Sequence, residues 1–486
     1  MKHSCLAALL LFPLLVAAGP AAKDRYYVFR FGGEPAGYVH ARDSRGPAGE
    51  RISWRETVLS LRRGDASVRI RMEVHSRSAA DFTPESFSLL KEETGQVQRV
   101  SGHRDGAEML VTVELGGKTS ARRISLPAGA VFSSAAEQRI AEAGLEPGQG
   151  LSFPVFLEEA NQVADSSFRL LRREPQEVLG AEQTVLVLTN EMLGIRGTET
   201  VREKDGALVA ADLPALGTSY RLASRSEAMG IGPGPDLLER ARYTTRVDLE
   251  PSETLTRLRL RLRGDELPDP PLDARQRRAG SAAAEEGLVL ELTPGRAPRA
   301  SALLPISGSV PARHLEPTAY EQSDDPRIRA AAARARGSAR RAWPVARKLS
   351  RWVHLHISDK TMDRPYLSAL ETLQGRSGDC TEHAILFSAL AKASGLPARI
   401  VNGLAYVDGA FAYHEWAEVY VGEAGWVAVD PTFDQAPIDA AHLALTVGSS
   451  DDEGMLQAGL AGLRYLHGLE LEVLEAERAD GTRIRP

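Results

Sequence analysis

Short runs of alternating apolar and polar residues, separated by turn residues, fill the sequence from Tyr26 to about Leu222. Alternation with a period of two is typical of strands that have one packed face and one solvated face. Glycine pairs such as Gly32-Gly33 and Gly116-Gly117 stand between runs, which favours antiparallel hairpins. The clearest runs are residues 51–63, 66–78, 108–117, 167–175 and 183–192. We therefore predict an all-β N-terminal domain over residues 23–225, as an antiparallel sheet, sandwich or half-barrel.

The composition shifts after residue 225 toward proline, arginine and alanine, and the strand-like runs become shorter. Three runs, at residues 241–250, 255–264 and 287–295, predict a second, small β domain with a linker over residues 226–322. Residues 266–286 are rich in proline and arginine, so we expect a mobile loop there. A solvated strand face explains the arginines better than binding to an anionic surface does.

The spacing of apolar residues becomes helical after Ser323. Pro326 and Pro344 stand at two helix starts, and Gly395 with Pro397 ends a later helix. The first helix candidate begins at residue 326. Three more helix candidates cover residues 343–357, 365–374 and 380–394. Strand candidates follow at 398–407, 411–421 and 426–432. We predict an α+β domain over residues 323–450, with one long helix before a three-stranded antiparallel meander, and a C-terminal extension at 451–486 that packs on it.

The first 22 residues have the features of an export signal. Lys2 and His3 precede an apolar run from Leu6 to Ala18, and small residues continue to Ala22. That run is too short to span a bilayer, and no later run approaches the roughly 18 residues required. We expect removal of residues 1–22, with cleavage after Ala18 or Ala22, and export to the periplasm or the extracellular space. An internal start site or an uncleaved anchor is the alternative.

Composition and cysteine count narrow the classes of function. The chain has 486 residues, 43% apolar and 26% charged, which suits about three globular domains. Its formal net charge of −6 supplies no basic field, so we expect no nucleic-acid partner. Only Cys5 and Cys380 occur, and Cys5 lies in the predicted signal. Cys380 is then an inert buried residue, an intermolecular link or a reactive thiol.

The residues around Cys380 favour a reactive thiol. Asp379 at the N-cap and Glu382 three residues later form a box-like helix start, which puts Cys380 at the first helical position. Free backbone amides at a helix N-terminus stabilise a thiolate and lower the pKa of a cysteine. Asp379 and Glu382 oppose this effect with negative charge, so the thiol requires a cationic partner.

His414 and Asp430 are the candidate partners on the following strands. Taken singly, His414 is also explained as an edge histidine and Asp430 as a turn former, although a carboxylate after an apolar strand needs hydrogen bonds. A three-residue loop at 423–425 places His414 and Asp430 on one face of the sheet. The same register pairs Asp430 with Glu418, roughly 13 Å from His414 along the strand. A bulge, strong twist or different loop must close that gap.

A thiol at a helix start, a histidine and a carboxylate are the components of a Cys-His-Asp acyl-transfer site. They lie in order in residues 375–407, 413–421 and 425–437, and these stretches closely resemble the transglutaminase-like core of the papain-like cysteine enzymes. The resemblance covers Trp343 to Thr446. Its strongest parts are Gly378-Asp379-Cys380, His414 with Trp416, and Asp430-Pro431.

The resemblance implies a role for each of these residues. Cys380 would be the nucleophile, His414 the general acid and base, and Asp430 the carboxylate that orients the imidazole. The thiolate would attack an amide carbonyl to form a thioester, the Cys380 amide and a second donor would hold the oxyanion, and His414 would protonate the departing amine.

Three further residues are candidates for supporting roles. Trp416 shares a strand face with His414. Gln374 could donate to the oxyanion, although an exposed residue at a helix end is the more ordinary explanation. His383 lies one helical turn from Cys380, where it either supports the site or hydrogen-bonds within the core. Cys380, His383, His414 and Asp430 also offer ligand types that suit zinc. The resemblance accounts for them without a metal, so we expect no metal and no cofactor.

These observations predict an exported cysteine enzyme that acts on amide bonds of protein or peptide substrates, with the β domains positioning a substrate or the cell envelope. Hydrolysis is favoured over crosslinking because water is the default acceptor of the acyl group. A protein-glutamine crosslinking transglutaminase and a catalytically silent binding module of the same fold remain as alternatives.

Overall fold

The computed structural model describes residues 23–63, 66–93, 96–280, 287–308, 310–361, 367–449 and 452–486. The predicted export signal, residues 1–22, and residues 64–65 between two of the predicted strands lie outside this part of the chain. Among the described residues, none of the helices has the length and apolar character needed to cross a membrane.

The N-terminal region forms one antiparallel sheet, in which 15 strands of the described chain follow the order β8-β7-β6-β5-β4-β3-β2-β1-β15-β14-β13-β12-β11-β10-β9. Neighbouring strands are consecutive in the chain except at the β1–β15 pair, so β8 and β9 stand at opposite ends of the order, and β9 alone runs parallel to its partner. The strands are β1 (Lys23–Phe31), β2 (Glu34–Arg45), β3 (Arg51–Arg63), β4 (Ala66–Ser78), β5 (Pro84–Glu93), β6 (Gln96–Asp105), β7 (Glu108–Leu115), β8 (Lys118–Ser125), β9 (Val131–Phe132), β10 (Gly150–Leu157), β11 (Gln162–Val178), β12 (Ala181–Met192), β13 (Ile195–Arg202), β14 (Leu208–Leu213) and β15 (Thr218–Ala223).

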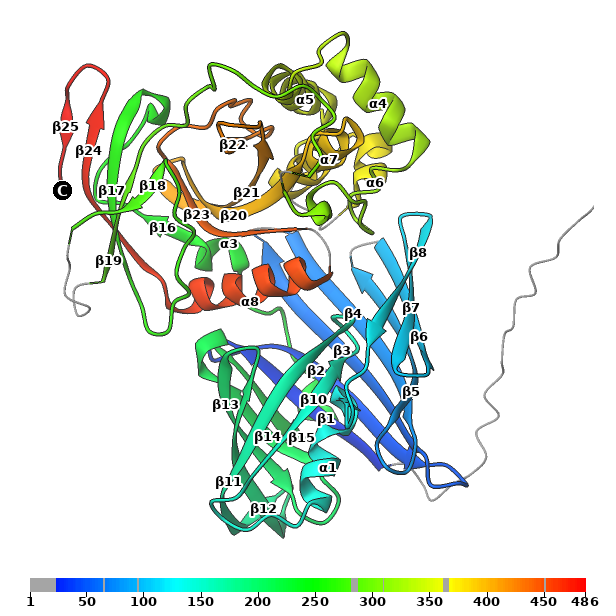
Figure 1. Ribbon diagram of the computed structural model, residues 1–486. Coiled ribbons are helices and arrows are strands. Elements are labelled where there is room, and N and C mark those ends of the chain that lie inside the picture. Colours follow the sequence, from blue (N-terminus) through cyan, green and yellow to red (C-terminus); the bar gives the residue numbers. More distant parts are fainter. Residues whose placement is uncertain are drawn as a thin grey trace, which may run out of the picture.

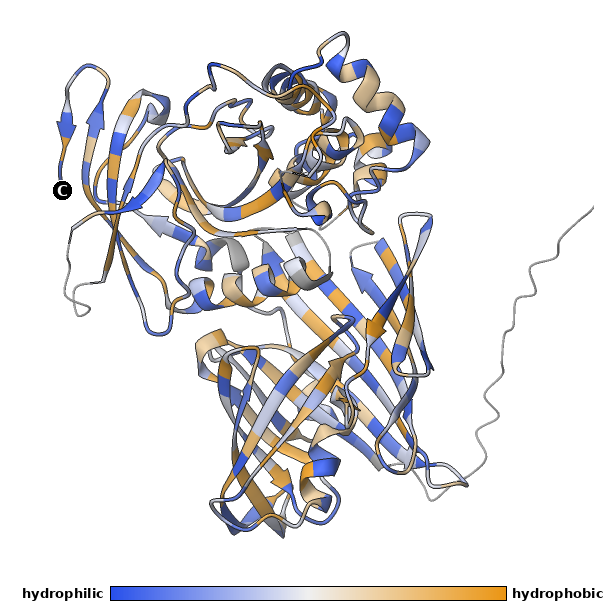
Figure 2. Cartoon of the chain, viewed as in Figure 1, coloured by the Kyte–Doolittle hydropathy of each residue, from blue (hydrophilic) through white to orange (hydrophobic). Residues whose placement is uncertain are grey.

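This sheet is strongly curved, and hydrophobic and hydrophilic residues alternate along its strands (Figures 1 and 2). Phe87, Phe132 and Phe156 pack together in one of its apolar clusters, with ring centroids 5.3–5.9 Å apart. The short helix α1 (Ala136–Glu142) adds Ile140 to a second cluster. The predicted all-β fold class of this region is confirmed, in the form of a single curved sheet.

An α+β unit follows, as predicted. Its helices are α4 (Pro326–Arg336), α5 (Ala342–His356), α6 (Ala369–Gly375) and α7 (Cys380–Ala393). Its sheet has the order β16-β21-β20-β23, with β22 also paired to β21. The strands are β16 (Arg242–Thr244), β20 (Ala398–Val407), β21 (Ala410–Tyr420), β22 (Trp426–Val429) and β23 (His442–Gly448). Helix α7 is buried from Thr381 to Lys392, because α4, α5 and α6 contact it as well as β20 and β21.

The strands expected in a separate small domain are distributed differently. β16 joins the sheet of the α+β unit, and the remaining strands form a third sheet, β18-β19-β17-β24-β25, with the end of the chain. Its strands are β17 (Leu255–Arg263), β18 (Gln276–Arg278), β19 (Leu288–Leu292), β24 (Glu470–Arg478) and β25 (Arg483–Ile484). Residues 226–322 therefore share a sheet with residues of the C-terminal extension. The remaining helices are α2 (Arg225–Met229), α3 (Leu237–Arg240) and α8 (Asp452–Gly468).

The expected mobile loop at residues 266–286 is partly fixed against β23. Gln276 is buried, and its amide exchanges hydrogen bonds with the backbone of Ala444, at 2.9 Å in each direction. Arg275 is also buried and donates to the carbonyl of His442 at 2.6 Å. Composition alone did not indicate these polar contacts. Residues 281–286 of this segment lie outside the described part of the chain.

Candidate active site

Cys380 is the first residue of α7. Its neighbour Asp379 is the N-cap, and the backbone N–H of Thr381 donates to Asp379 Oδ1 at 2.9 Å. Glu382 Oε2 accepts from the backbone N–H of Asp379 at 2.9 Å, which completes the capping box expected from the sequence. The Cys380 side chain is partly exposed and lines a cavity.

The Cys380 sulfur contacts β21 between the two stretches of this strand that pair with β16 and with β22. β16 pairs with residues 410–412 of β21, and β22 pairs with residues 417–420, so the edge between them is open to α7. Glu415 lies in this gap, and its backbone N–H donates to the Cys380 sulfur. The start of α7 is thereby held against the strand that carries His414.

His414 and Asp430 are in direct contact. His414 Nε2 lies 2.6 Å from Asp430 Oδ2, and both side chains are buried. The register differs from the predicted one by two residues, because Tyr420 pairs with Trp426 and the connection is longer than the three residues assumed. A shift of two preserves the face and places Asp430 opposite Trp416, which closes most of the predicted gap.

His442 and Asp439 extend this contact and were missed by the sequence analysis. His442 Nε2 lies 3.1 Å from the same oxygen of Asp430, and His442 Nδ1 lies 2.8 Å from Asp439 Oδ1. Asp430 Oδ1 accepts from the backbone N–H groups of Thr432 and Phe433 at 2.7 and 3.2 Å. The predicted meander ended before β23, so nothing in the sequence placed His442 beside Asp430.

These contacts keep Asp430 ionised. Burial alone would raise the pKa of Asp430, but the charges and hydrogen bonds of His414 and His442 hold it well below its usual range. Burial likewise works to lower the pKa of His442, yet its bonds to Asp430 and Asp439 raise it above the ordinary value. The structure therefore contains a buried carboxylate that accepts from two imidazoles.

The thiol differs from the expectation of a lowered pKa. Desolvation by the protein around the sulfur, which is open only toward the cavity, followed by the charges of Asp379 and Glu415, raises the pKa of Cys380 well above its usual range. Burial and Asp379 also raise the pKa of Glu382 to about 8, and that of Glu415 rises well above its usual range. These effects outweigh the helix N-terminus and the single N–H donor, so the isolated site favours the neutral thiol.

The three supporting candidates lie in different surroundings. Trp416 is fully buried beside His414, with ring centroids 6.1 Å apart, and Phe433 stacks on the His414 ring at 4.6 Å. His383 is buried, its Nδ1 lies 2.5 Å from the carbonyl oxygen of Asp379, and burial lowers its pKa to about 4. Gln374 is exposed near the end of α6 and is not among the residues that line the cavity. The two rings thus fix His414, and Gln374 is outside the site.

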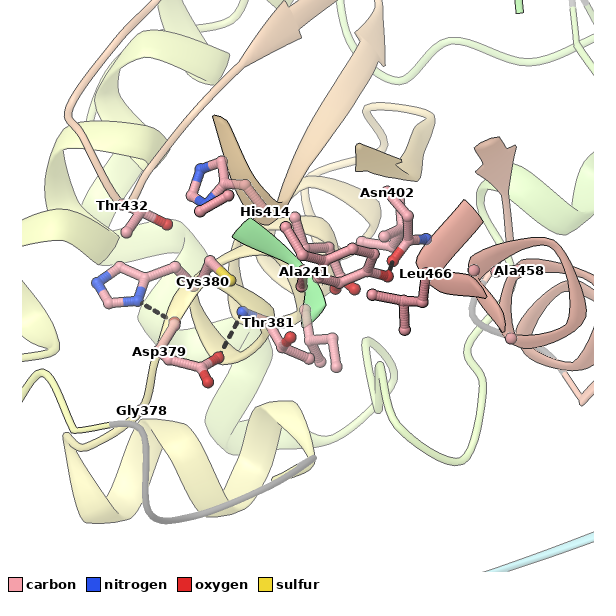
Figure 3. A pocket seen from close by; sticks show the side chains of 18 of the residues that line it. Ala241, Gly378, Asp379, Cys380, Thr381, Asn402, His414, Thr432, Ala458 and Leu466 are labelled. Atoms are coloured by element: carbon pink, nitrogen blue, oxygen red, sulfur yellow. Dashed lines mark hydrogen bonds between the residues drawn. The ribbon is translucent and has the colours of Figure 1, made fainter. Parts of the chain in front are cut away.

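Cys380 and His414 line one cavity of about 670 Å³. Figure 3 shows both at one end of it, with Thr432 nearby, and Leu466 and Ala458 of α8 at the other end. Pockets of this volume that combine apolar walls with a few polar groups are typical of ligand sites.

The described residues that could surround a metal ion are His414, Asp430 and His442, whose ligand atoms lie within 4.8 Å of one another. This set omits Cys380 and His383, two of the four residues considered for zinc. Nε2 of His414 and Nε2 of His442 each lie at hydrogen-bond distance from Asp430 Oδ2. Hydrogen bonds therefore account for this cluster.

Comparison with known proteins identifies the family of this part of the chain. Residues 329–431 match the sequence profile of the Transglutaminase-like superfamily. A protein-glutamine gamma-glutamyltransferase from Pseudomonas aeruginosa is 33% identical over an alignment of 102 positions, which covers 18% of this chain and 15% of that protein. The chain thus spans only a small part of the length of this curated relative. The predicted resemblance to the superfamily is confirmed for this domain.

Two solved structures resemble larger parts of the chain at low identity. A candidate cysteine protease from Cytophaga hutchinsonii is 14% identical, with a TM-score of 0.31, and the match covers 48% of this chain and 89% of that one. A β-barrel-like protein of unknown function from Brucella abortus is 9% identical, with a TM-score of 0.33, and the match covers 41% of this chain and 96% of that one.

Proposed function

Because residues 329–431 belong to the transglutaminase-like superfamily, we propose that this domain is a cysteine enzyme that cleaves amide bonds in proteins or peptides through a thioester. Cys380 is the nucleophile, His414 the general base and acid, and Asp430 the carboxylate that orients His414. The observation that carries the proposal is the 2.6 Å contact between His414 Nε2 and Asp430 Oδ2, next to a cavity shared by His414 and Cys380.

The raised pKa of the thiol determines how the first step proceeds. Asp430 occupies Nε2 of His414, so Nδ1 is the nitrogen that accepts the Cys380 proton as the sulfur attacks the carbonyl carbon. The new imidazolium is stabilised by Asp430, which stays ionised because His414 and His442 lower its pKa. The backbone N–H of Cys380, at the start of α7, is positioned to stabilise the oxyanion.

Collapse of the tetrahedral intermediate breaks the C–N bond. The proton held by His414 moves to the departing nitrogen, and the acyl group remains on Cys380 as a thioester. Water then attacks the thioester, His414 takes one of its protons, and the products are a carboxylic acid and the free thiol. His442 and Asp439 act as positioning residues in this scheme, because His442 holds Asp430, Asp439 holds His442, and neither lines the cavity beside Cys380.

Transfer to a primary amine is the second candidate. It is favoured by the 33% identity to a protein-glutamine gamma-glutamyltransferase over the segment that contains the site. The same thioester serves both reactions, and only the acceptor differs. Hydrolysis remains the leading proposal because water is always present.

Intact-protein mass spectrometry can test both outcomes. The protein lacking residues 1–22 is mixed with a library of peptide amides, with and without a primary amine. We expect an acyl adduct on the wild type that is absent from Cys380→Ala and strongly reduced in His414→Gln, because His414 is the base for the first step. Release of free acid supports hydrolysis, and release of an amide of the added amine supports transfer. Failure of Cys380 to form any adduct or to react with iodoacetamide would favour a silent binding module.

We also propose that the protein is exported after cleavage of residues 1–22. The support is the charged start and the short apolar run of this segment. Expression of the full chain in a bacterium, followed by fractionation and N-terminal sequencing, should give a mature protein that begins at Gly19 or Lys23. An intact N-terminus in the cytosol would contradict the proposal.

A further inference from the structure

The cavity that holds Cys380 extends well beyond the transglutaminase-like domain. Leu61 of β3 and Val68 and Ile70 of β4 come from the N-terminal sheet, and Leu463 and Leu466 come from α8. All five are apolar. Helix α8 lies between the N-terminal sheet and the sheet of the α+β unit (Figure 1). Three separate parts of the chain therefore build one apolar region continuous with the candidate nucleophile.

Three charged residues that line this cavity have partners within the protein. Glu93 pairs with Lys91 at 2.7 Å, Arg242 donates to the carbonyl of Asp408 at 2.6 Å, and Lys360 donates to the carbonyl of Thr432 at 3.2 Å. The ion pair offsets the charge of Glu93, and the two carbonyls occupy donor atoms of Arg242 and Lys360. The far end of the cavity thus recognises an occupant chiefly through apolar contact.

Two glycines of α8 leave part of the cavity free of side chains. A Cβ atom at Gly459 or Gly462 would meet no atom within 4 Å, whereas a Cβ at Gly454 would lie 2.0 Å from the carbonyl oxygen of Ser449. Close backbone approach explains Gly454. It does not explain Gly459 and Gly462, which line the cavity although glycine is unfavourable inside a helix. Larger side chains there would occupy the cavity.

We propose that this region, lined by Leu61, Val68, Ile70, Ala458, Gly462 and Leu466, is a specificity site that binds a large apolar side chain of the substrate while the adjoining carbonyl lies at Cys380. The substrate class is a peptide or protein with an aliphatic or aromatic residue close to the reacting amide. This inference rests on the proposed function. It also gives α8 and the N-terminal sheet a part in substrate choice.

Alkylation of Cys380 by substituted iodoacetamides tests the site without knowledge of the natural substrate. The probes are iodoacetamide and N-hexyl iodoacetamide, with each rate divided by the rate on glutathione and the product mapped to Cys380 by mass spectrometry. In the wild type we expect the hexyl probe to react at least about tenfold faster, because the cavity binds the chain. The ratio should fall toward one in Gly462→Leu, which fills the cavity at a position with room for a side chain.

Gln457→Leu is the matched control, since it adds the same side chain to an exposed position of α8 that does not line the cavity. It should keep the preference for the hexyl probe. A wild-type ratio near one would overturn the specificity site, as would a preference that survives in Gly462→Leu. Either result leaves the reactivity of Cys380, and with it the proposed function, intact.

A reversible ligand tests binding to the apolar region independently of the reaction at Cys380. N-hexylacetamide cannot alkylate a thiol, and we expect it to raise the Tm of the wild type and of Cys380→Ser but not that of Gly462→Leu. Stabilisation without any alkylation of Cys380 would support the apolar site and overturn the proposed function. Absence of both effects would overturn both.

Discussion

At the scale of single residues, the geometry of the site depends on which hydrogen bonds each side-chain atom makes. One oxygen of Asp430 accepts from two imidazoles, and its other oxygen accepts from two backbone N–H groups. A carboxylate bound in this way can neither rotate nor readily take a proton. His414 in turn packs against the rings of Phe433 and Trp416, so its orientation is set before any substrate arrives.

The pH dependence of Cys380 alkylation tests its electrostatic environment. Because the pKa of the thiol is raised, we expect the rate with iodoacetamide to increase by about tenfold per pH unit between pH 7 and 9. Asp379→Asn should move the profile to lower pH, since it removes a negative charge and keeps a good N-cap residue. A rate that is already constant from pH 6 upward would indicate a preformed thiolate and contradict this interpretation.

His442 should make the stability of the protein depend on pH. Its pKa in the folded state lies above the unfolded value of about 6.5, so its contribution is complete below pH 6.5 and is lost as the pH rises through the folded pKa. We expect His442→Gln to reduce the free energy of unfolding more at pH 5.5 than at pH 9, by on the order of 1 kcal/mol. Urea titrations at the two values measure this difference. Equal losses at both would contradict a charged His442.

At the scale of helices and strands, local signals were sufficient for some elements and not for others. The expected strand at 398–407 is β20, and the expected helix at 380–394 is α7 with one residue fewer. Capping residues, an apolar run and a following Gly-Leu-Pro mark these elements within a few residues of sequence. Cys380 and Asp430 lie at such marked boundaries, at the start of α7 and directly after β22, whereas His414 lies inside β21 and was selected from its motif.

Contacts between distant segments could not be predicted in the same way. The register of β22 on β21 depends on the connection after Tyr420, and the predicted pairing was two residues off. His442 was missed because β23 pairs with β20 across a long separation in sequence. The third sheet joins β17 to β24 for the same reason. Alternation gives the face of a strand but not its partner.

Gly403 shows how closely β20, β21 and β23 approach one another. A Cβ atom there would lie 2.1 Å from the carbonyl oxygen of Leu443 and 2.6 Å from the Trp416 ring. We expect Gly403→Ala to lower the free energy of unfolding by roughly 2–3 kcal/mol, because backbone and a buried ring must both move. Gly459→Ala is the control, since its Cβ meets nothing and alanine favours a helix, so stability should rise by about 0.5–1 kcal/mol. Equal effects in thermal melts would contradict this difference.

At the scale of the whole molecule, the N-terminal sheet is packed into the core of the α+β unit. Leu115, at the end of β7, belongs to the same apolar cluster as Tyr320 and Leu370. Next to it, Gln96 Nε2 donates to Glu371 Oε2 at 2.9 Å, and Lys118 forms an ion pair with Asp324. These contacts hold the curved sheet against α6. Strands β3 and β4 of the same sheet contribute apolar residues to the cavity.

Leu115→Ala therefore tests whether the N-terminal sheet stabilises the site. Leu115 is 2% exposed, and its truncation should cost about 2–4 kcal/mol, much of it in the core that carries α7. We expect the alkylation rate of Cys380 to change to that of an unfolded thiol at a lower urea concentration than in the wild type. Leu188→Ala is the matched control, because Leu188 is equally buried but lies in a separate cluster of the N-terminal sheet. Equal shifts of this urea concentration in both variants would show that Leu115 does not couple the N-terminal sheet to the site. No shift in either variant would show that the N-terminal sheet and the α+β unit unfold independently.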